Sequence, residues 1–209
     1  MKTKIFNLII IDESGSMQSI KQEAINSVNE TIQTIRAAEK MHIDQEHYVS
    51  LVSFNNDVKI INDCVKIADV KELTDATYQP DCCTALYDAM GTSINMLRQH
   101  IAPGDKVLVT VVTDGYENAS KEWNSKAIKA LVEQMRGQGW VFAYIGANHD
   151  VESVATSISI TNAISFEASD IGVQHMSKRM NSCMGRWFAR INKNMSSAES
   201  DNASFFDDL

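Results

Sequence analysis

The sequence predicts an α/β protein with a doubly wound, mostly parallel sheet, one antiparallel edge strand and helices on both faces. Nearly continuous apolar runs at 5–11, 107–112 and 141–145 are typical of strands buried on both faces of a parallel sheet. Segments with apolar residues at helical spacing separate these runs. This alternation of strand and helix is the pattern of a doubly wound fold.

The first half of the chain supplies one predicted strand, a helix and a hairpin. Residues 18–39 carry a single apolar stripe, so we expect a helix directly after the first strand. The apolar stretches 49–54 and 58–61 flank Asn55-Asn56-Asp57, and Asn tolerates positive φ. We therefore expect a hairpin that ends in an antiparallel edge strand.

The second half continues the alternation to a long final helix. The apolar stripe of the next predicted helix consists of Leu86, Met90, Ile94, Leu97 and Ile101, and Pro103-Gly104 ends it. A helix over 121–136, with Trp123 inward, and a fourth buried strand over 163–166 follow. The last helix is expected over 170–192, with a buried stripe rich in Met.

Composition excludes several functional classes. The 209 residues carry 19 Lys plus Arg against 27 Asp plus Glu, a formal net charge of −8, which argues against sequence-independent nucleic-acid binding. No apolar stretch approaches the roughly 20 residues that span a bilayer, so no membrane insertion is expected. The apolar start is short and ends in Asp12-Glu13, unlike a signal peptide, and the four cysteines form no disulfide pattern. We therefore expect a cytoplasmic protein.

Five oxygen-bearing side chains follow predicted strands or open a helix. The first strand runs into Asp12, Ser14 and Ser16, which stand at alternate positions, so a curled loop can turn them to one point. Thr84 precedes the mid-chain helix, and Asp114 ends the strand at 107–112. In open α/β sheets, ligands bind beyond the carboxyl ends of the strands, where the strand order reverses.

Hydroxyl and carboxylate oxygens are hard ligands, suited to Mg²⁺ or Mn²⁺ rather than to a thiolate metal. With Ser14, Ser16 and Thr84 as direct ligands, the ion would stay strongly electrophilic because these oxygens are neutral. Asp12 and Asp114 would then act through waters and hydrogen bonds. An open coordination position would favour an anionic oxygen, most simply the Asp or Glu carboxylate of a partner.

These residues resemble the metal-ion-dependent adhesion site of von Willebrand factor type A domains. That family has Asp-x-Ser-x-Ser after the first strand, a Thr before a mid-chain helix and an Asp that ends a later strand, often as Thr-Asp-Gly. The sequence has Asp12, Ser14, Ser16, Thr84 and Asp114 at the five positions. The resemblance covers roughly residues 4–167 and is strongest to compact, cytosolic, single-domain bacterial or phage members.

The resemblance implies one domain over residues 1–194, bound to Mg²⁺, with Mn²⁺ or Ca²⁺ as alternatives. Residues 195–209 are then an acidic tail, expected to be mobile. One departure concerns the loop before Thr84, where Cys82-Cys83 stand in place of the small residues common in the family. The larger side chains leave the approach of Thr84 to the metal open at this stage.

Three functions remain open from the sequence, and the weakest of them is a structural subunit in which the metal only stiffens the loops. The first is a non-enzymatic protein-binding domain in which the ion bridges to an acidic residue of a partner. The second is a Mg²⁺-dependent hydrolase or phosphoryl-transfer enzyme that uses Asp12. A second Asp where Ser14 stands, a Gly-rich phosphate loop and an oriented general base are all missing, so binding is favoured. Positions expected to form the rim of the binding site are Met17, Gln18, Tyr87, Tyr116, Glu117, Asn118 and His149.

Overall fold

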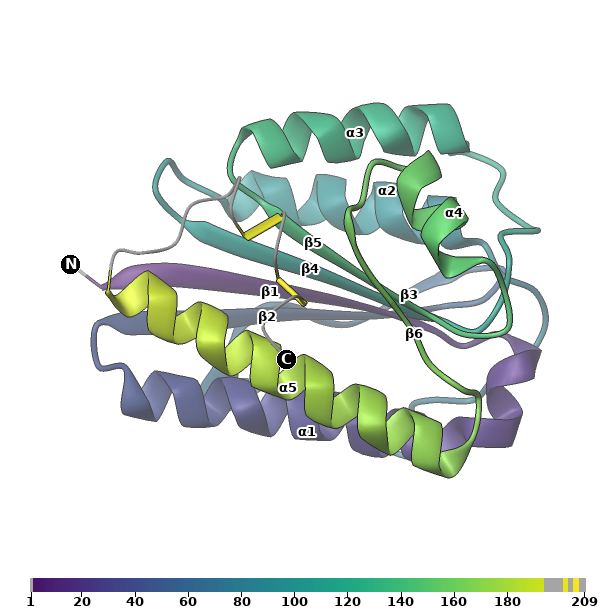
Figure 1. Ribbon diagram of the computed structural model, residues 1–209, viewed down its shortest axis with the longest axis horizontal. Helices are drawn as coiled ribbons and strands as arrows, with labels where there is room; N and C mark the ends of the chain where they lie inside the picture. Colours follow the sequence, from purple (N-terminus) through teal and green to yellow (C-terminus); the bar gives the residue numbers. More distant parts are fainter. Residues whose placement is uncertain (1, 194–200, 203–204, 207–209) are drawn as a thin grey trace.

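The computed structural model describes residues 2–193, 201–202 and 205–206, and its centre is a six-stranded sheet of order β3-β2-β1-β4-β5-β6 (Figure 1). The strands are β1 (Thr3–Asp12), β2 (Gln45–Phe54), β3 (Val58–Lys66), β4 (Lys106–Thr113), β5 (Val141–Gly146) and β6 (Asn162–Ser165). Every neighbouring pair is parallel except β2 with β3, which form the antiparallel hairpin. The predicted fold class and edge strand are confirmed.

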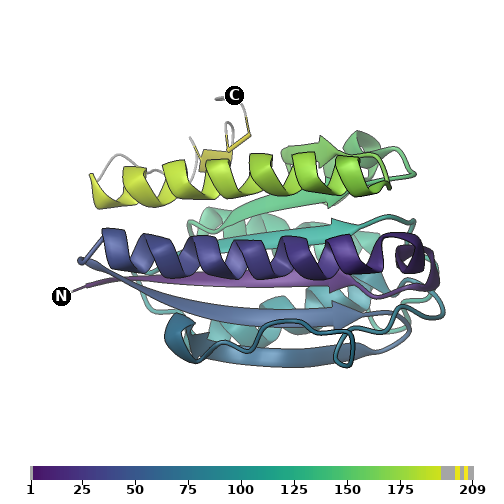
Figure 2. The same ribbon diagram turned by 90° about the horizontal axis from the view of Figure 1, so that it is seen from below.

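Five α-helices cover the two faces of the sheet. They are α1 (Lys21–Met41), α2 (Leu86–Leu97), α3 (Ser125–Gly137), α4 (Val151–Ser157) and α5 (Asp170–Asn192), with a 3-10 turn, η1 (Gly15–Ile20), before α1. Helices α1 and α5 lie side by side on one face, and α2, α3 and α4 lie on the other (Figures 1 and 2). The order of strands reverses between β1 and β4, which places the switch point of the fold there.

Two apolar cores, one on each face of the sheet, bury the stripes that the sequence predicted. The apolar stripe of α1 packs on β1 and β2, and the Met-rich stripe of α5 is buried beside it, through to Trp187. The stripe of α2 is buried from Leu86 to Leu97 on the opposite face. Among the described residues, no helix is long and apolar enough to cross a bilayer.

Two helices differ from the sequence prediction. Helix α3 begins at Ser125, so Trp123 lies in the preceding loop and not on the helix. Asn124 ends that loop, because its side chain accepts a hydrogen bond from the Ala127 N–H and caps the helix. The short helix α4 was not predicted, since its seven residues are too few to show a clear helical period.

The structure describes four residues of the segment that was expected to be an acidic, mobile tail, and the mobility of that segment stays a prediction. Asp201, Asn202, Phe205 and Phe206 are all buried. The indole N–H of Trp187 donates to Asp201 Oδ2 over 2.8 Å, and both Phe rings join the core beneath α5. The remaining tail residues, 194–200, 203–204 and 207–209, lie outside the described residues. The division of the chain at residue 194 stays a prediction.

Candidate metal centre

The two strands at the switch point bring Asp12 and Asp114 to the same edge of the sheet. Asp12 is the last residue of β1, and Asp114 directly follows the last residue of β4, Thr113. The Thr113 hydroxyl donates to Asp12 Oδ2 over 2.5 Å, which ties the ends of the two neighbouring strands together. The loops that follow β1 and β4 therefore begin side by side.

Asp12 is fully buried, and both of its carboxylate oxygens have partners. Oδ1 accepts the Ser14 N–H at 2.7 Å, and Oδ2 accepts the Thr113 hydroxyl. Burial raises the pKa of Asp12 to about 6, against the opposing effect of these hydrogen bonds, and the nearby Asp114 raises it further. A nearby cation would favour the charged form of this carboxylate.

The hydroxyls of the first loop connect it to Asp114. Ser14 Oγ and Ser16 Oγ lie 3.2 Å apart, and Ser16 Oγ donates to Asp114 Oδ1 over 2.5 Å. Asp114 Oδ2 is buried and has no hydrogen-bond partner among the described residues. Burial also raises the pKa of Asp114. A buried carboxylate oxygen without a donor is costly, and a divalent ion with its waters is the group that would satisfy it.

Thr84 reaches the same region from the start of α2. It is buried, and a Cβ atom placed on Gly115 would lie 3.6 Å from Thr84 Oγ1, so the hydroxyl borders the Asp114 loop. The two cysteines before Thr84 do not keep it away. Cys82 adopts φ 62° and accepts the Gly15 N–H at 3.2 Å through its carbonyl, while Cys82 and Cys83 both expose free thiols.

Asn118 fixes Thr84 against the loop that carries Asp114. The Thr84 N–H donates to Asn118 Oδ1 over 2.9 Å, and the Asn118 N–H donates to the Thr84 carbonyl over 3.0 Å. The sequence analysis placed Asn118 on the rim and missed this role. No sequence pattern pairs residues 34 positions apart in two loops, so only the fold reveals the contact.

Glu117 was also expected on the rim, but its carboxylate points back into the protein. Oε2 accepts the Tyr87 N–H at 2.9 Å, and Oε1 accepts the N–H groups of Ala119 and Ser120. The first turn of α2, which has no cap of its own, thus receives one from the loop after β4. The Thr84 and Asp114 loops form one connected unit.

Glu13, between the predicted ligands, is a buried residue that the sequence analysis did not assign. Its carboxylate accepts the Ser53 hydroxyl at 2.5 Å and the N–H of Gln79, and Lys59 Nζ lies 3.7 Å away. These contacts join the end of β2 and the segment before Thr84 to the first loop. An alternating Asp-x-Ser-x-Ser pattern gives no signal for this role.

The rim of the site is aromatic on the side of β5. The exposed Tyr116 ring lies 5.2 Å from the His149 ring, and the Tyr116 hydroxyl accepts the Asp150 N–H. His149 donates from Nδ1 to the Ala147 carbonyl and accepts the Tyr144 hydroxyl at Nε2. Met17, expected on the rim, instead points into the core and is 1% exposed.

The five predicted residues therefore converge at the carboxyl ends of β1 and β4 and the start of α2. Within the part of the chain that is described, no cluster of three or more His, Cys, Asp or Glu side chains exists that could hold a metal alone. The donor set is instead two carboxylates and three hydroxyls, which fits a hard divalent ion.

The chain belongs to the von Willebrand factor type A domain family, whose model matches residues 8–179. This is a family of metal-dependent protein-interaction domains, typically without enzymatic activity. No curated protein is similar enough in sequence to count as a match.

Similar solved structures come from surface and matrix proteins. The PilB minor pilin of Streptococcus sanguinis is 13% identical at TM-score 0.59, over 90% of this chain and 63% of the pilin. The vWF domain of the type V pili tip protein Mfa5 of Porphyromonas gingivalis is 10% identical at TM-score 0.59, over 87% and 96%. Proximal thread matrix protein 1 of the mussel byssus, with a zinc-occupied MIDAS motif, is 14% identical at TM-score 0.59, over 88% and 46%. At these identities the likeness establishes the fold.

Proposed function

We propose that the chain is a divalent-metal-dependent protein-binding domain. Ser14, Ser16 and Thr84 would contact the ion, with Asp12 and Asp114 neutralising its charge. The observation that carries the proposal is the buried, unpartnered Asp114 Oδ2 beside the serine hydroxyls. Mg²⁺ is the proposed ion, and Mn²⁺ or Ca²⁺ would fit the same oxygen ligands.

The proposed partner is a protein that presents an Asp or Glu carboxylate to the ion. Because the proposed direct ligands are neutral hydroxyls, the ion would stay strongly electrophilic, and an anionic oxygen would suit its open coordination position. The chain itself carries a net charge of −8 and repels an acidic partner at long range. Attraction would therefore be local and would depend on the metal. We also propose that this encounter takes place in the cytoplasm.

The alternative, a hydrolase or phosphoryl-transfer enzyme with Asp12 as nucleophile, is disfavoured by the contacts of that carboxylate. Both Asp12 oxygens already accept hydrogen bonds, from the Ser14 N–H and from the Thr113 hydroxyl. His149, near the site, donates one ring nitrogen to a backbone carbonyl and bonds Tyr144 with the other, so it is not poised as a general base.

Affinity capture from a lysate tests the proposal. Wild type with Mg²⁺ is compared with wild type in EDTA and with the double variant Ser14→Ala, Ser16→Ala. Ser27→Ala, a serine on α1 away from the site, is the matched control. A partner retained by wild type and Ser27→Ala, and lost in the other two arms, supports metal bridging. The same proteins in every arm would argue against it.

A further inference from the structure

Strand β6 is the edge of the sheet and has unpaired backbone groups. It pairs in parallel with β5, and the pairing continues to the Phe166 N–H, which donates to the Gly146 carbonyl at 2.9 Å. In a parallel strand, the backbone N–H and C=O groups of alternate residues point to the same neighbouring strand. Ile164, two residues before Phe166, therefore also directs its backbone groups to β5. Ala163 and Ser165 consequently direct their N–H and C=O groups outward, and the described residues supply no partner strand there.

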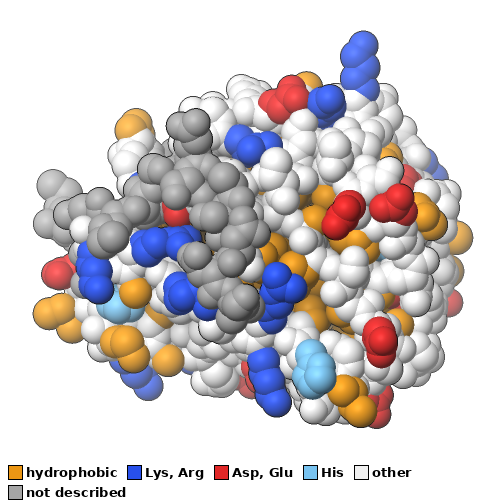
Figure 3. Space-filling view, in the orientation of Figure 1, with side chains coloured by type: hydrophobic (Ala, Val, Ile, Leu, Met, Phe, Trp, Pro, Cys, Tyr) orange, Lys and Arg blue, Asp and Glu red, His pale blue; other side chains and the backbone are white. Residues whose placement is uncertain are grey.

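A groove of about 460 Å³ runs between this edge and α5. Ile164, Phe166 and Met176 form its apolar lining, and Ile171 at the start of α5 is 67% exposed beside it. Figure 3 shows apolar surface between β6 and α5 in the middle of this face of the molecule. A large exposed Ile next to an open sheet edge is typical of a binding surface.

The α5 side of the groove carries the positive charge of Arg179 in a chain that is acidic overall. His175 and Arg179 line its α5 side, and Glu167 is the one acidic residue that lines it. The Arg179 guanidinium lies 5.8 Å from the Phe206 ring and donates to the Phe206 carbonyl, and no described carboxylate forms an ion pair with it. An acidic side chain is the group this rim would attract.

The beginning of β6 already holds backbone from another segment. Asn162 Oδ1 accepts the Phe205 N–H at 3.1 Å, and Asn162 Nδ2 donates to the Asp201 carbonyl at 3.2 Å. The groove extends from there along Ile164 to Glu167. Main chain thus already lies beside the first residue of β6, and no described segment pairs with the rest of this edge.

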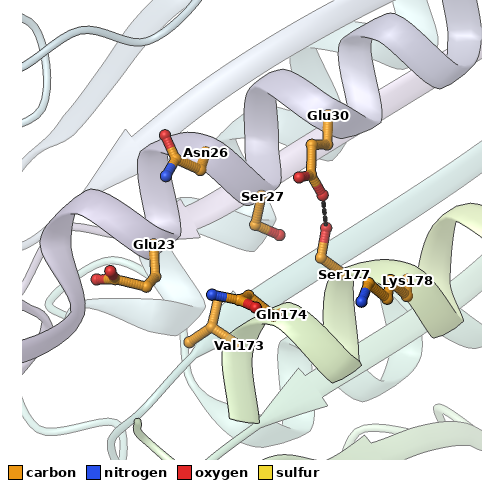
Figure 4. A pocket seen from close by; sticks show the side chains of 8 residues that line it. All are labelled: Glu23, Asn26, Ser27, Glu30, Val173, Gln174, Ser177 and Lys178. Atoms are coloured by element: carbon orange, nitrogen blue, oxygen red, sulfur yellow. Dashed lines mark hydrogen bonds between the residues drawn. The ribbon is translucent and has the colours of Figure 1, made fainter. Parts of the chain in front are cut away.

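A second cleft, between α1 and α5, suits a ligand less well. It measures about 160 Å³ and is lined mainly by polar side chains, among which Ser177 Oγ already donates to Glu30 Oε2 at 2.7 Å (Figure 4). Neither helix has backbone groups free to bind a partner along its length, whereas β6 does. The β6 edge is therefore the stronger candidate.

We propose that the groove between β6 and α5 binds an extended segment of a partner protein, which adds to the sheet as a seventh strand. Backbone hydrogen bonds to Ala163 and Ser165 supply affinity. Alternate apolar side chains of the segment pack on Ile171 and Met176, and an acidic side chain faces Arg179. This site is separate from the metal centre, and binding to it requires no metal.

A random octapeptide library displayed on phage, selected on the full chain in EDTA, tests this site. The selected sequences should share apolar residues at alternate positions and an acidic residue. Synthetic versions should bind at least tenfold more weakly to Ile171→Asp and to Arg179→Glu. Ile43→Asp, a 74% exposed isoleucine elsewhere, and Lys178→Glu, next to Arg179, are the matched controls and should bind as wild type does.

Two further variants separate strand addition from simple apolar contact. Ser165→Pro removes an outward N–H without removing a bond to β5, and it should abolish binding. N-methylation of alternate peptide bonds in the synthetic peptide should do the same. The proposal would be overturned if the selected peptides shared no such pattern, or if they bound Ile171→Asp as tightly as wild type. If the wild-type chain self-associates and Ile171→Asp does not, the groove binds a second copy of this chain instead. If peptides bind only after residues 207–209 are removed, the groove is assigned to this chain's own end.

Discussion

At the scale of single residues, the metal centre depends on side chains whose hydrogen bonds are already made. Asp12 holds the ends of β1 and β4 together, and Ser16 holds Asp114. Among the described residues, Asp114 Oδ2 has no hydrogen-bond partner, and the Ser14 and Ser16 hydroxyl oxygens lie 3.2 Å apart in the neighbouring loop. Because these hydrogen bonds already hold the side chains in place, less conformational entropy would be lost when an ion binds.

Asn118→Ala should lower metal affinity by about tenfold or more, because outer partners of metal ligands typically contribute 10- to 100-fold. The change frees the Thr84 N–H and loosens the hydroxyl that borders Asp114. Titration calorimetry with Mn²⁺ measures the effect. Asn124→Ala removes a comparable side-chain-to-backbone bond at the start of α3 and should leave the affinity unchanged. Equal losses in both variants would contradict a specific role for Asn118.

His47 should make the protein less stable in acid. It is buried at the start of β2 against Phe188, and burial lowers its pKa to about 4. In the unfolded chain the pKa of His47 is about 6.5, so protonation of His47 favours the unfolded state. The stability that comes from burying the neutral ring is complete above pH 6.5 and is lost as the pH falls towards 4. The loss amounts to about 3 kcal/mol at most.

Urea unfolding at pH 7 and pH 5 checks this prediction, with His47→Leu for comparison. The variant should lose less stability than wild type between the two pH values, whatever its stability at pH 7. An identical loss in both proteins would show that other groups govern the acid response.

The sequence predicted the five residues of the candidate site because their spacing is local or tied to strand ends. Asp12 ends one strand, Ser14 and Ser16 lie in the loop after it, and Asp114 directly follows another strand. The contacts of Asn118 with Thr84 and of Glu117 with the first turn of α2 were not predicted, because these partners lie about 30 residues away in sequence. Hydrophobic periodicity carries no information about such polar contacts between loops.

At the scale of elements, the contact between α2 and the loop before α3 is tightly packed. A Cβ atom on Gly91 would lie 2.2 Å from the Trp123 ring. The backbone N–H of Trp123 donates to the Asp88 carboxylate, which holds this part of the loop against α2. Gly91→Ala should therefore destabilise the protein by about 2 kcal/mol or more. Gly185→Ala on α5, with open space around it, should instead stabilise by about 0.5–1 kcal/mol. Thermal unfolding of both variants gives the comparison, and destabilisation of similar size would contradict it.

The tail contributes to stability through Asn202. Its side chain accepts the Phe142 N–H and donates to the Trp140 carbonyl, both at the start of β5. Asn202→Ala should cost about 2–4 kcal/mol, because it leaves two buried backbone groups without these partners. Urea unfolding measures the change. A cost within 0.5 kcal/mol, as for an exposed position, would mean that the tail is not part of the folded unit.

The strands and long helices could be predicted because each has an unbroken apolar run or stripe, as in β1, β4 and α5. Helix α4 is too short for its period to stand out, and Trp123 fitted the stripe of α3 although the Asn124 cap begins the helix after it. The tail was judged by its polar composition, whereas its Phe pair and Asn202 form specific contacts that composition does not reveal.

At the scale of the whole molecule, the candidate metal centre would link ion binding to stability. The pKa of Asp12 is about 6 in the folded protein, against a reference value of 3.8, so the folded state binds the proton more tightly than the unfolded chain does. The contribution of this proton to folding stability is complete below about pH 3.8. That contribution is lost as the pH rises through 6, and amounts to about 3 kcal/mol at most. A bound cation would offset it.

The stabilisation by about 10 mM Mg²⁺ should therefore be larger at pH 7.5 than at pH 5. At the higher pH, fewer protons compete with the ion for the Asp12 carboxylate. Thermal unfolding at both pH values, with and without the ion, measures this difference. Asp12→Asn, which cannot titrate, should remove most of it. Stabilisation independent of pH in wild type would contradict the linkage.

The most direct test of the central claim is a calorimetric titration of Mn²⁺ into the wild-type chain, the double variant Ser14→Ala, Ser16→Ala, and the control Ser27→Ala. Saturable binding of one ion is expected in wild type and in the control, and no measurable binding is expected in the double variant. Equal binding in all three proteins, or none in wild type, would contradict the proposal that these loops hold a divalent ion.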